Sequence, residues 1–426
     1  MAPKPRAKRM RSGGHAVDRL GDLPDALLHV ILSFLPAVQV VRTSVLSRRW
    51  RDLWRSTPCI NIDDAEHDFL TSTRRNRHGP AENWRKLENF TTNLLLFRIN
   101  DTSLNKFRIS ACHWPDDELR RRDIDRWVRR GIRYRPQVLE IIISASPAVP
   151  FPHMGASSCR LKRLQIHYMY LDDQFGRLLF SGCPVLEDLA LSMCRNDFRE
   201  FKSRTLKKLA IDRCVNLTGD PVVIAAPSAA YLRLSIPPDC YSSGVSMCKT
   251  ASLVKASVDV LCLGETFSLI HQRRILGSLC NVTNLELWGF QRRAMLVEES
   301  AEFPIFANLQ TLLLNRCFLD KCDLSDKLEA LGSFVQNAPC LEKLTLICCM
   351  FDVEMETEEM ETEEDQVVRE TITLQRQDQN NNRFPKLKFV EVVYEEDHDH
   401  QLVELVWGIG RKLPDANIIL RKLNLD

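Results

Sequence analysis

Residues 20–54 read LGDLPDALLHVILSFLPAVQVVRTSVLSRRWRDLW and decide how the fold begins. Apolar residues follow Pro24 at helical spacing, and a proline in the first turn of a helix removes no hydrogen bond. Pro36 ends this first helix, and the valines of 38–45 and the tryptophans of 50–54 carry the apolar surface onto two more short helices. Three helices of this size cannot hide so much apolar surface among themselves. The stretch therefore predicts a binding partner.

The order of these motifs resembles the F-box of plant proteins. Leu23-Pro24-Asp25 begins it, ILSFL lies at its centre and TSVLSRRWRDLW ends it. The resemblance implies docking on a Skp-type adaptor and, through it, on the cullin of an SCF ubiquitin ligase. Apolar anchors at the centre of such an interface contribute roughly 1–3 kcal/mol each. The adaptor-facing residues would be Leu23, Pro24, Leu27, Leu28, Ile31, Leu32, Leu35, Val41 and Trp50. The alternative is an ordinary helical cap on a larger domain, with the same leucines and tryptophans as core.

A second pattern, L-x-x-L-x-L-x-x-C, recurs along the rest of the chain and resembles a leucine-rich repeat. The full copies are Leu104-Phe107-Ile109-Cys112, Leu186-Leu189-Leu191-Cys194, Leu206-Leu209-Ile211-Cys214, Leu309-Leu312-Leu314-Cys317 and Leu341-Leu344-Leu346-Cys349. Weaker copies without the cysteine begin at Val138, Leu161, Ala229, Leu253, Val282 and Leu387. The repeat implies short parallel strands with apolar side chains pointing inward and a buried thiol at the turn. We therefore expect an α/β fold, a three-helix F-box followed by an irregular horseshoe.

The segments between the frames differ in character. Residues 84–97 and 123–131 show helical apolar spacing, with Gly131 near the expected end of the second helix. Prolines at 226–238 interrupt the middle of the chain, so these repeats are expected to be short and closed by turns. Near the end, residues 401–413 predict a helix and 417–420 a last strand, which together would cap the open end of the repeats.

Composition divides the chain further. The predicted parts are a disordered basic tail (1–15), the F-box (16–62), a linker and helix (63–98), the repeats (99–350), an acidic and polar flexible insertion (351–383), and a last repeat with a C-terminal cap (384–426). The last part lies where many plant relatives carry an FBD region. The acidic insertion is either a mobile surface loop or a docking site for a basic client.

Charge and hydropathy exclude several classes of protein. A net charge of +2 argues against nucleic-acid binding. No run of eighteen apolar residues and no apolar signal core occur, which predicts no membrane span and no secretion. We expect a nuclear or cytoplasmic protein in which the fifteen cysteines stay reduced. The basic tail is either a nuclear import signal or a solvated end.

No catalytic motif is present. Residues 397–400 (DHDH) offer possible metal ligands, but CxxC and HExxH spacings are missing, and a solvated acidic loop is the simpler interpretation. The thiols lack a neighbouring histidine signature for a nucleophile. The sequence therefore predicts a non-enzymatic chain with no cofactor, which would hold a substrate in place for other subunits.

The repeat side chains that point away from the core would line the concave face of a horseshoe and bind the client protein. They include aromatic residues and arginine, which are frequent interface anchors: Arg163, His167, Tyr168, Lys208, Arg213, Tyr231, Arg233 and Trp288. For each residue the alternative is an ordinary exposed strand position. Two functions stay open, an SCF substrate receptor and a non-degradative interaction scaffold.

Overall fold

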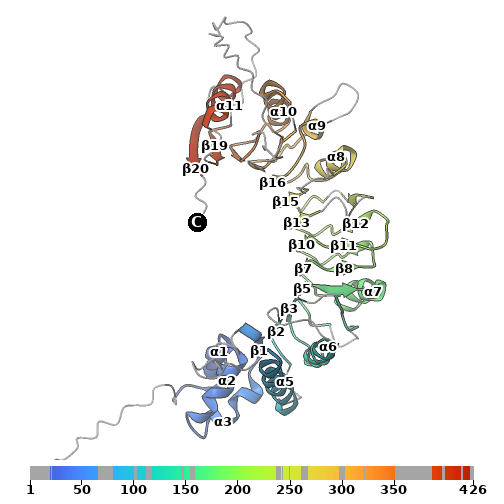
Figure 1. Cartoon of the computed structure of the whole chain (residues 1–426), viewed down its shortest axis with the longest axis vertical. Coiled ribbons are helices and arrows are strands. Elements are labelled where there is room, and N and C mark those ends of the chain that lie inside the picture. Colours follow the sequence, from blue (N-terminus) through green and yellow to red (C-terminus); the bar gives the residue numbers. More distant parts are fainter. Residues whose placement is uncertain are drawn as a thin grey trace, which may run out of the picture.

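Thirteen parallel strands line the inner side of an arch in the computed structural model of the chain (Figure 1). In sheet order they are β1 (Cys59–Asp63), β2 (Lys106–Ala111), β3 (Val138–Ile143), β5 (Arg163–His167), β7 (Asp188–Ser192), β10 (Lys208–Asp212), β13 (Tyr231–Ser235), β15 (Lys255–Asp259), β16 (Asn284–Trp288), β17 (Thr311–Asn315), β18 (Lys343–Ile347), β19 (Phe389–Tyr394) and β20 (Asn417–Lys422). The structure describes residues 20, 22–65, 80–99, 103–111, 118–144, 148–153, 159–236, 241, 243–248, 250–260, 267–296, 303–320, 322–350, 386–395, 399–413 and 416–422.

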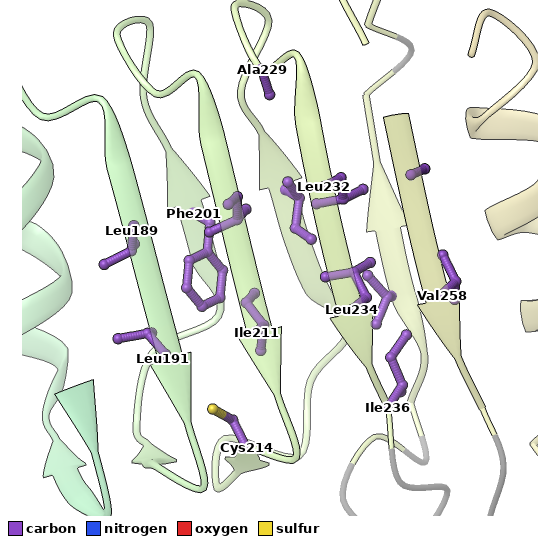
Figure 2. Packing of buried hydrophobic residues seen from close by; sticks show 14 of the residues in the cluster. Leu189, Leu191, Phe201, Ile211, Cys214, Ala229, Leu232, Leu234, Ile236 and Val258 are labelled. Carbon is purple, nitrogen blue, oxygen red and sulfur yellow. The ribbon is translucent and has the colours of Figure 1, made fainter. Parts of the chain in front are cut away.

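The repeat frame sets the register of this sheet. Leu189, Leu209 and Leu232 are neighbours in one row, and Leu191, Ile211 and Leu234 are neighbours in the next. Figure 2 shows that Leu189, Leu191, Ile211, Leu232 and Leu234 point to the same side of the strands, where they pack with Phe201. Apolar side chains at alternate positions of parallel strands thus form two buried rows. The predicted leucine-rich-repeat architecture is confirmed.

The frame predicted at Val138 is wrong by two residues. Leu139 pairs with Phe107 and Ile141 with Ile109, so this frame begins at Pro136. The segment Val-Leu-Glu-Ile-Ile-Ile carries apolar residues at nearly every position, and its pattern therefore does not distinguish the two registers. Strand β1, which was not predicted, continues both inward rows with Ile60 and Ile62.

The repeat cysteines are structural. Cys194, Cys214, Cys317 and Cys349 are all buried. The Cys194 thiol donates to the Ile166 carbonyl at 3.5 Å, and the Cys317 thiol donates to the Leu287 carbonyl at 3.4 Å, so each thiol joins its turn to the preceding strand. Cys112 lies outside the described residues.

Helices cover the convex side of the sheet (Figure 1). They are α5 (Pro80–Phe97), α6 (Glu118–Arg133), α7 (Asp173–Gly182), α8 (Leu269–Ser278), α9 (Arg292–Met295), α10 (Leu324–Gln336) and α11 (Asp399–Lys412). The helices expected at 84–97, 123–131 and 401–413 are confirmed within α5, α6 and α11, apart from the last residue, Leu413, which follows α11. Gly131 lies near the end of α6, as predicted, two residues before Arg133, and a methyl group added at this position would overlap the Phe107 ring.

Short strands close the middle repeats, where turns in place of full helices were predicted; the strands themselves were not predicted. A four-stranded sheet joins β4 (Val149–Pro150), β6 (Met169–Leu171), β8 (Arg195–Asn196) and β11 (Val215–Asn216). A three-stranded sheet joins β9 (Glu200–Lys202), β12 (Val222–Ala225) and β14 (Val245–Met247). No helix occurs between α7 and α8 in the described part of the chain, and the horseshoe is non-uniform for this reason.

The two ends of the sheet are built differently. At the N-terminal end, α2 (Ala37–Arg42) packs on β1, and Ala37 joins the repeat core with Ile60 and Ile62. At the other end, β20 pairs with β19 and no described strand covers its outer edge. The closure that we predicted for this end is therefore incomplete.

Several predictions fall on residues that the structure does not describe. They are the basic tail (1–15), most of the polar linker after β1 and the whole of the acidic insertion (351–383). Among the described residues, no helix is long and apolar enough to cross a membrane.

Candidate functional site

The N-terminal module is a cluster of short helices, α1 (Asp25–Ser33), α2, the 3₁₀ turn η1 (Thr43–Val45), α3 (Trp50–Leu53) and the 3₁₀ turn η2 (Trp54–Ser56). Arg49 holds its two ends together. Its guanidinium bonds the Asp25 carboxylate at 2.6 Å and also donates to the Leu23 carbonyl. The LPD and RRW motifs, which lie 24 residues apart, are thus parts of one contact.

One face of α1 points into the module. Leu28 and Leu32 are 0% and 1% exposed and pack with Val40, Trp50 and Leu53. These positions, together with Leu35, are spaced for one side of a helix. Three of the predicted adaptor-facing residues, Leu28, Leu32 and Trp50, are therefore core residues, and in this conformation they cannot touch a partner.

Three further members of the predicted set are only partly accessible. Leu23 and Leu35 pack against the small F-box core, while Val41 packs against the core of the repeats. Val41 therefore links the module to β1. Helix α2 acts as the helical cap that was the alternative prediction, and it does so within the F-box.

The opposite face of α1 is apolar and exposed. Leu27 is 50% exposed and Ile31 39%, and Pro24 before them is also exposed. Two neighbours that were not predicted, Val30 and Phe34, are 52% and 81% exposed. Residues 27, 31 and 34 have the same helical spacing as residues 28, 32 and 35, shifted by one position. This second apolar stripe could have predicted the exposed face from the sequence. We call Leu27, Val30, Ile31 and Phe34 the outward face of α1.

The turn after α2 adds to the exposed apolar surface of the module. Val45 in η1 is 84% exposed and Leu46 64%. Large exposed apolar side chains gathered in one small module mark an interaction site.

The predicted client-binding residues lie on or directly after the strands of the main sheet, on the side away from the core. Arg163, Lys208 and Tyr231 begin their strands, and the register places them in one row with Asp188. Arg233 lies in the middle row, and His167 and Trp288 lie in the last row. Tyr168 and Arg213 directly follow β5 and β10 in the left-handed backbone region, at φ of 55° and 46°. The structure brings all but Trp288 together on β5, β10 and β13; Trp288 is on β16, two strands from β13.

Ion pairs neutralise most charges of this concave surface. Arg163 pairs with Asp188 at 2.9 Å, Lys255 with Glu286 at 2.6 Å and Lys343 with Glu391 at 2.9 Å. The bond to Glu286 raises the pKa of Lys255, while burial lowers the pKa of His167.

Three cations of the surface are not neutralised in this way. Lys208, Arg213 and Arg233 form no ion pair with a described carboxylate, and all three are exposed. Ala190 and Ala210 are the neighbours of Arg233 in the middle row, and both have small side chains. We call Lys208, Arg213, Tyr231 and Arg233 the β10–β13 patch. The four residues were predicted from the sequence, but the sequence does not show which charged residues of the surface form ion pairs.

The described residues hold no group of three or more histidine, cysteine or acidic side chains close enough to bind a metal ion. Asp397 and His398 of the DHDH segment lie outside the described part. Burial and a hydrogen bond to Glu395 raise the pKa of Cys348 to about 12, which makes this thiol a poor nucleophile near neutral pH.

Comparison with known proteins matches both parts of the chain. The F-box domain family matches residues 20–61. The meiotic F-box protein MOF of Oryza sativa subsp. japonica is 34% identical over 358 residues, which span 78% of this chain and 72% of that protein. An FBD-associated F-box protein of Arabidopsis thaliana is 29% identical over 373 residues, 79% of this chain and 78% of that protein. An F-box/FBD/LRR-repeat protein of the same plant is 28% identical over 372 residues, 77% and 78% of the two chains.

Each of these matches covers more than three quarters of this chain. This chain therefore belongs to the plant family of F-box proteins with leucine-rich repeats.

Proposed function

We propose that this chain is the substrate-recognition subunit of an SCF ubiquitin ligase. The F-box would dock on a Skp-type adaptor and so reach the cullin, while the repeats hold the client protein. The observation that carries the proposal is the outward face of α1, a row of exposed apolar side chains on a module with a filled core of its own. F-box proteins are in general adaptors without catalytic activity, so the ubiquitin transfer belongs to other subunits.

The outward face of α1 is large enough to act as an anchor. Burying one Leu, Ile, Val or Phe side chain contributes about 1.5–3 kcal/mol, and this face offers four that are at present between 39% and 81% exposed. Since Leu28 and Leu32 hold the helix from below, the anchors are preorganised and lose little conformational freedom on binding.

The β10–β13 patch is the part of the concave surface best suited to a client. Tyr and Arg are the residue types that dominate binding energy at interfaces. Lys208, Arg213 and Arg233 bring positive charge without a described counter-charge, so the surface favours an acidic client segment. Holding such a client beside the ligase raises its local concentration at the transferred ubiquitin, and this proximity is the chain's contribution to the reaction.

The first experiment is co-purification of the full chain with a Skp-type adaptor and a cullin. Leu27→Asp/Ile31→Asp should lose the complex while circular dichroism shows an unchanged fold, because both side chains are exposed. Ile270→Asp, on the exposed side of α8, is the matched control and should keep the complex. A folded wild-type chain that recovers no adaptor would overturn the proposal.

The second experiment concerns the client. Proteins that accumulate when the cullin is inactivated and co-purify with the wild-type chain should be lost by Lys208→Ala/Arg233→Ala. Arg274→Ala, an exposed cation on α8, is the control. A client that binds the chain but keeps its normal turnover without cullin activity would favour the non-degradative scaffold instead.

A further inference from the structure

The last strand of the sheet has an open edge. β20 bonds β19 over the whole of Asn417–Lys422, and its other edge faces no described strand. Figure 1 shows β20 at one end of the arch and the F-box helices at the opposite end. The N–H and C=O groups of an edge strand are free to pair with another strand, and natural proteins normally block such edges with charge, proline or a covering element.

Here the edge is apolar on both sides of the strand. Ile418 and Leu420 continue the two inward rows, facing Val390 and Val392 of β19. Leu420 is nevertheless 48% exposed, and Ile419, on the concave side, is 47% exposed. A terminal repeat needs a polar outer face to stand alone in water, whereas β20 exposes Ile419 and Leu420 beside Arg421 and Lys422.

The sequence of β20 fits a second copy of itself. Two copies related by a twofold axis perpendicular to the sheet pair antiparallel, and residues that face each other must lie on the same side of the sheet. Centring the axis on Ile419 satisfies this rule. The facing pairs are then Ile419 with Ile419, Ile418 with Leu420, Asn417 with Arg421 and Ala416 with Lys422.

These pairs are favourable in both apolar contact and charge. Every exposed apolar residue of β20 meets an apolar residue, and neither cation meets another cation, whose direct opposition would be destabilising. Moving the axis by one residue to Leu420 would place Lys422 opposite Ile418, so a single register is favoured. Arg421 also keeps its bond to Glu391 within its own chain, at 3.3 Å.

We propose that two copies of this chain join through their β20 edges and form one continuous sheet. Helix α11 adds exposed apolar surface at the same end, with Val403 at 65% and Trp407 at 54% exposure. The F-box helices lie at the far end of each arch, and the interface therefore leaves both adaptor-docking surfaces free (Figure 1). The dimer does not depend on the function proposed above.

Sedimentation velocity of the full chain, over a roughly hundredfold range of concentration, tests the interface because dimerisation depends on concentration. The wild type should shift from monomer to dimer. Ile419→Lys should weaken the dimer by about tenfold or more, since the residue faces itself across the axis and the substitution sets two like charges opposite each other. Ile270→Lys on α8 should dimerise as the wild type does. A wild type that stays monomeric throughout overturns the proposal.

A charge-pairing experiment distinguishes this register from any other use of Ile419. Ile419→Glu alone should weaken the dimer by a similar factor, for the same reason as Ile419→Lys. An equimolar mixture of the two variants should recover the dimer as a heterodimer, because the facing pair is then Lys with Glu. Ile419 is exposed, so neither variant should lose its fold. Failure of the mixture to associate would overturn the register.

Discussion

The first and last strands of the main sheet carry the same two inward positions, but these positions are covered in β1 and partly exposed in β20. In β1 these positions are Ile60 and Ile62, which are 4% and 2% exposed under the F-box helices. In β20 they are Ile418 and Leu420, and Leu420 is 48% exposed. Ile62 is thus core at one end of the sheet, while Leu420, at the equivalent place at the other end, is half exposed. The difference comes from whether a neighbouring element covers them.

The comparison gives the F-box two roles in the architecture. Its inner residues cap the repeats, because Ala37 and Val41 of α2 pack on the repeat core. Its outer residues, on α1, keep an apolar face toward solvent. The C-terminal α11 and β20 cover the neighbouring repeat but leave an open edge of their own.

The largest difference is expected from matched substitutions at the two ends. Ile62→Ala should lower the free energy of unfolding by about 2–5 kcal/mol, because it opens a cavity in a filled core. Leu420→Ala should lower it by less than about 1 kcal/mol, because half of that side chain is already in water. Thermal and urea unfolding of dilute samples measure both. Equal losses would show that the ends do not differ in packing.

A second test separates the two faces of α1. Leu28→Ala should destabilise the F-box by about 2 kcal/mol, somewhat less than Ile62→Ala, since its small core can partly close the cavity. Leu27→Ala, one residue away, should leave stability within about 0.5 kcal/mol and weaken adaptor binding instead. Thermal unfolding measures stability and titration with the adaptor measures binding. If both variants lost stability, or both lost only adaptor binding, the assignment of the two faces would be wrong.

Buried thiols report how readily each region opens. Cys349 lies in the turn that follows β18, and β18 is two strands from β20 at the end of the sheet. Cys194 lies in the turn that follows β7, in the middle of the sheet. Local opening starts where few neighbours hold the structure, so Cys349 should be alkylated about tenfold faster than Cys194, a difference of about 1.4 kcal/mol in opening. Mass spectrometry after timed alkylation measures the ratio, with exposed Cys159 and Cys248 as fast references. Faster labelling of Cys194 would place the weak point elsewhere.

The smallest effect on stability is expected in the β10–β13 patch, far from both ends. Lys208→Ala and Arg233→Ala remove exposed side chains without a described ion pair, so the free energy of unfolding should change by less than about 0.5 kcal/mol. The same variants should reduce client binding. Unfolding curves that move by several degrees would mean that the patch supports the fold and is not a free surface.

Much of this fold follows from local pattern. A two-residue alternation places Leu189 and Leu191, or Leu312 and Leu314, on one side of a strand wherever the strands pair, and the frame recurs along the chain, in five copies with a cysteine at the turn. The pattern failed at Val138, where apolar residues occupy both sides. It also missed β1, because a single Ile-Asn-Ile segment without the leading leucine and the cysteine does not stand out from the F-box before it.

The candidate site followed from the sequence only in part. The LPD and RRW motifs located the F-box, but Leu27 and Leu28 are indistinguishable by residue type. Their roles separate because Trp50 and Leu53 pack against one and not the other. Likewise, Lys208 and Lys255 are both lysines at the start of a strand, and Glu286, 31 residues further along, neutralises only Lys255.

Residue order alone therefore specified the class of fold, the F-box and the buried thiols, since each depends on spacing within a few residues. The outward face of α1, the uncompensated cations and the open edge at β20 emerged from contacts between segments distant in sequence. The exposure of a side chain depends on which segments pack against it, and residue type alone does not determine that.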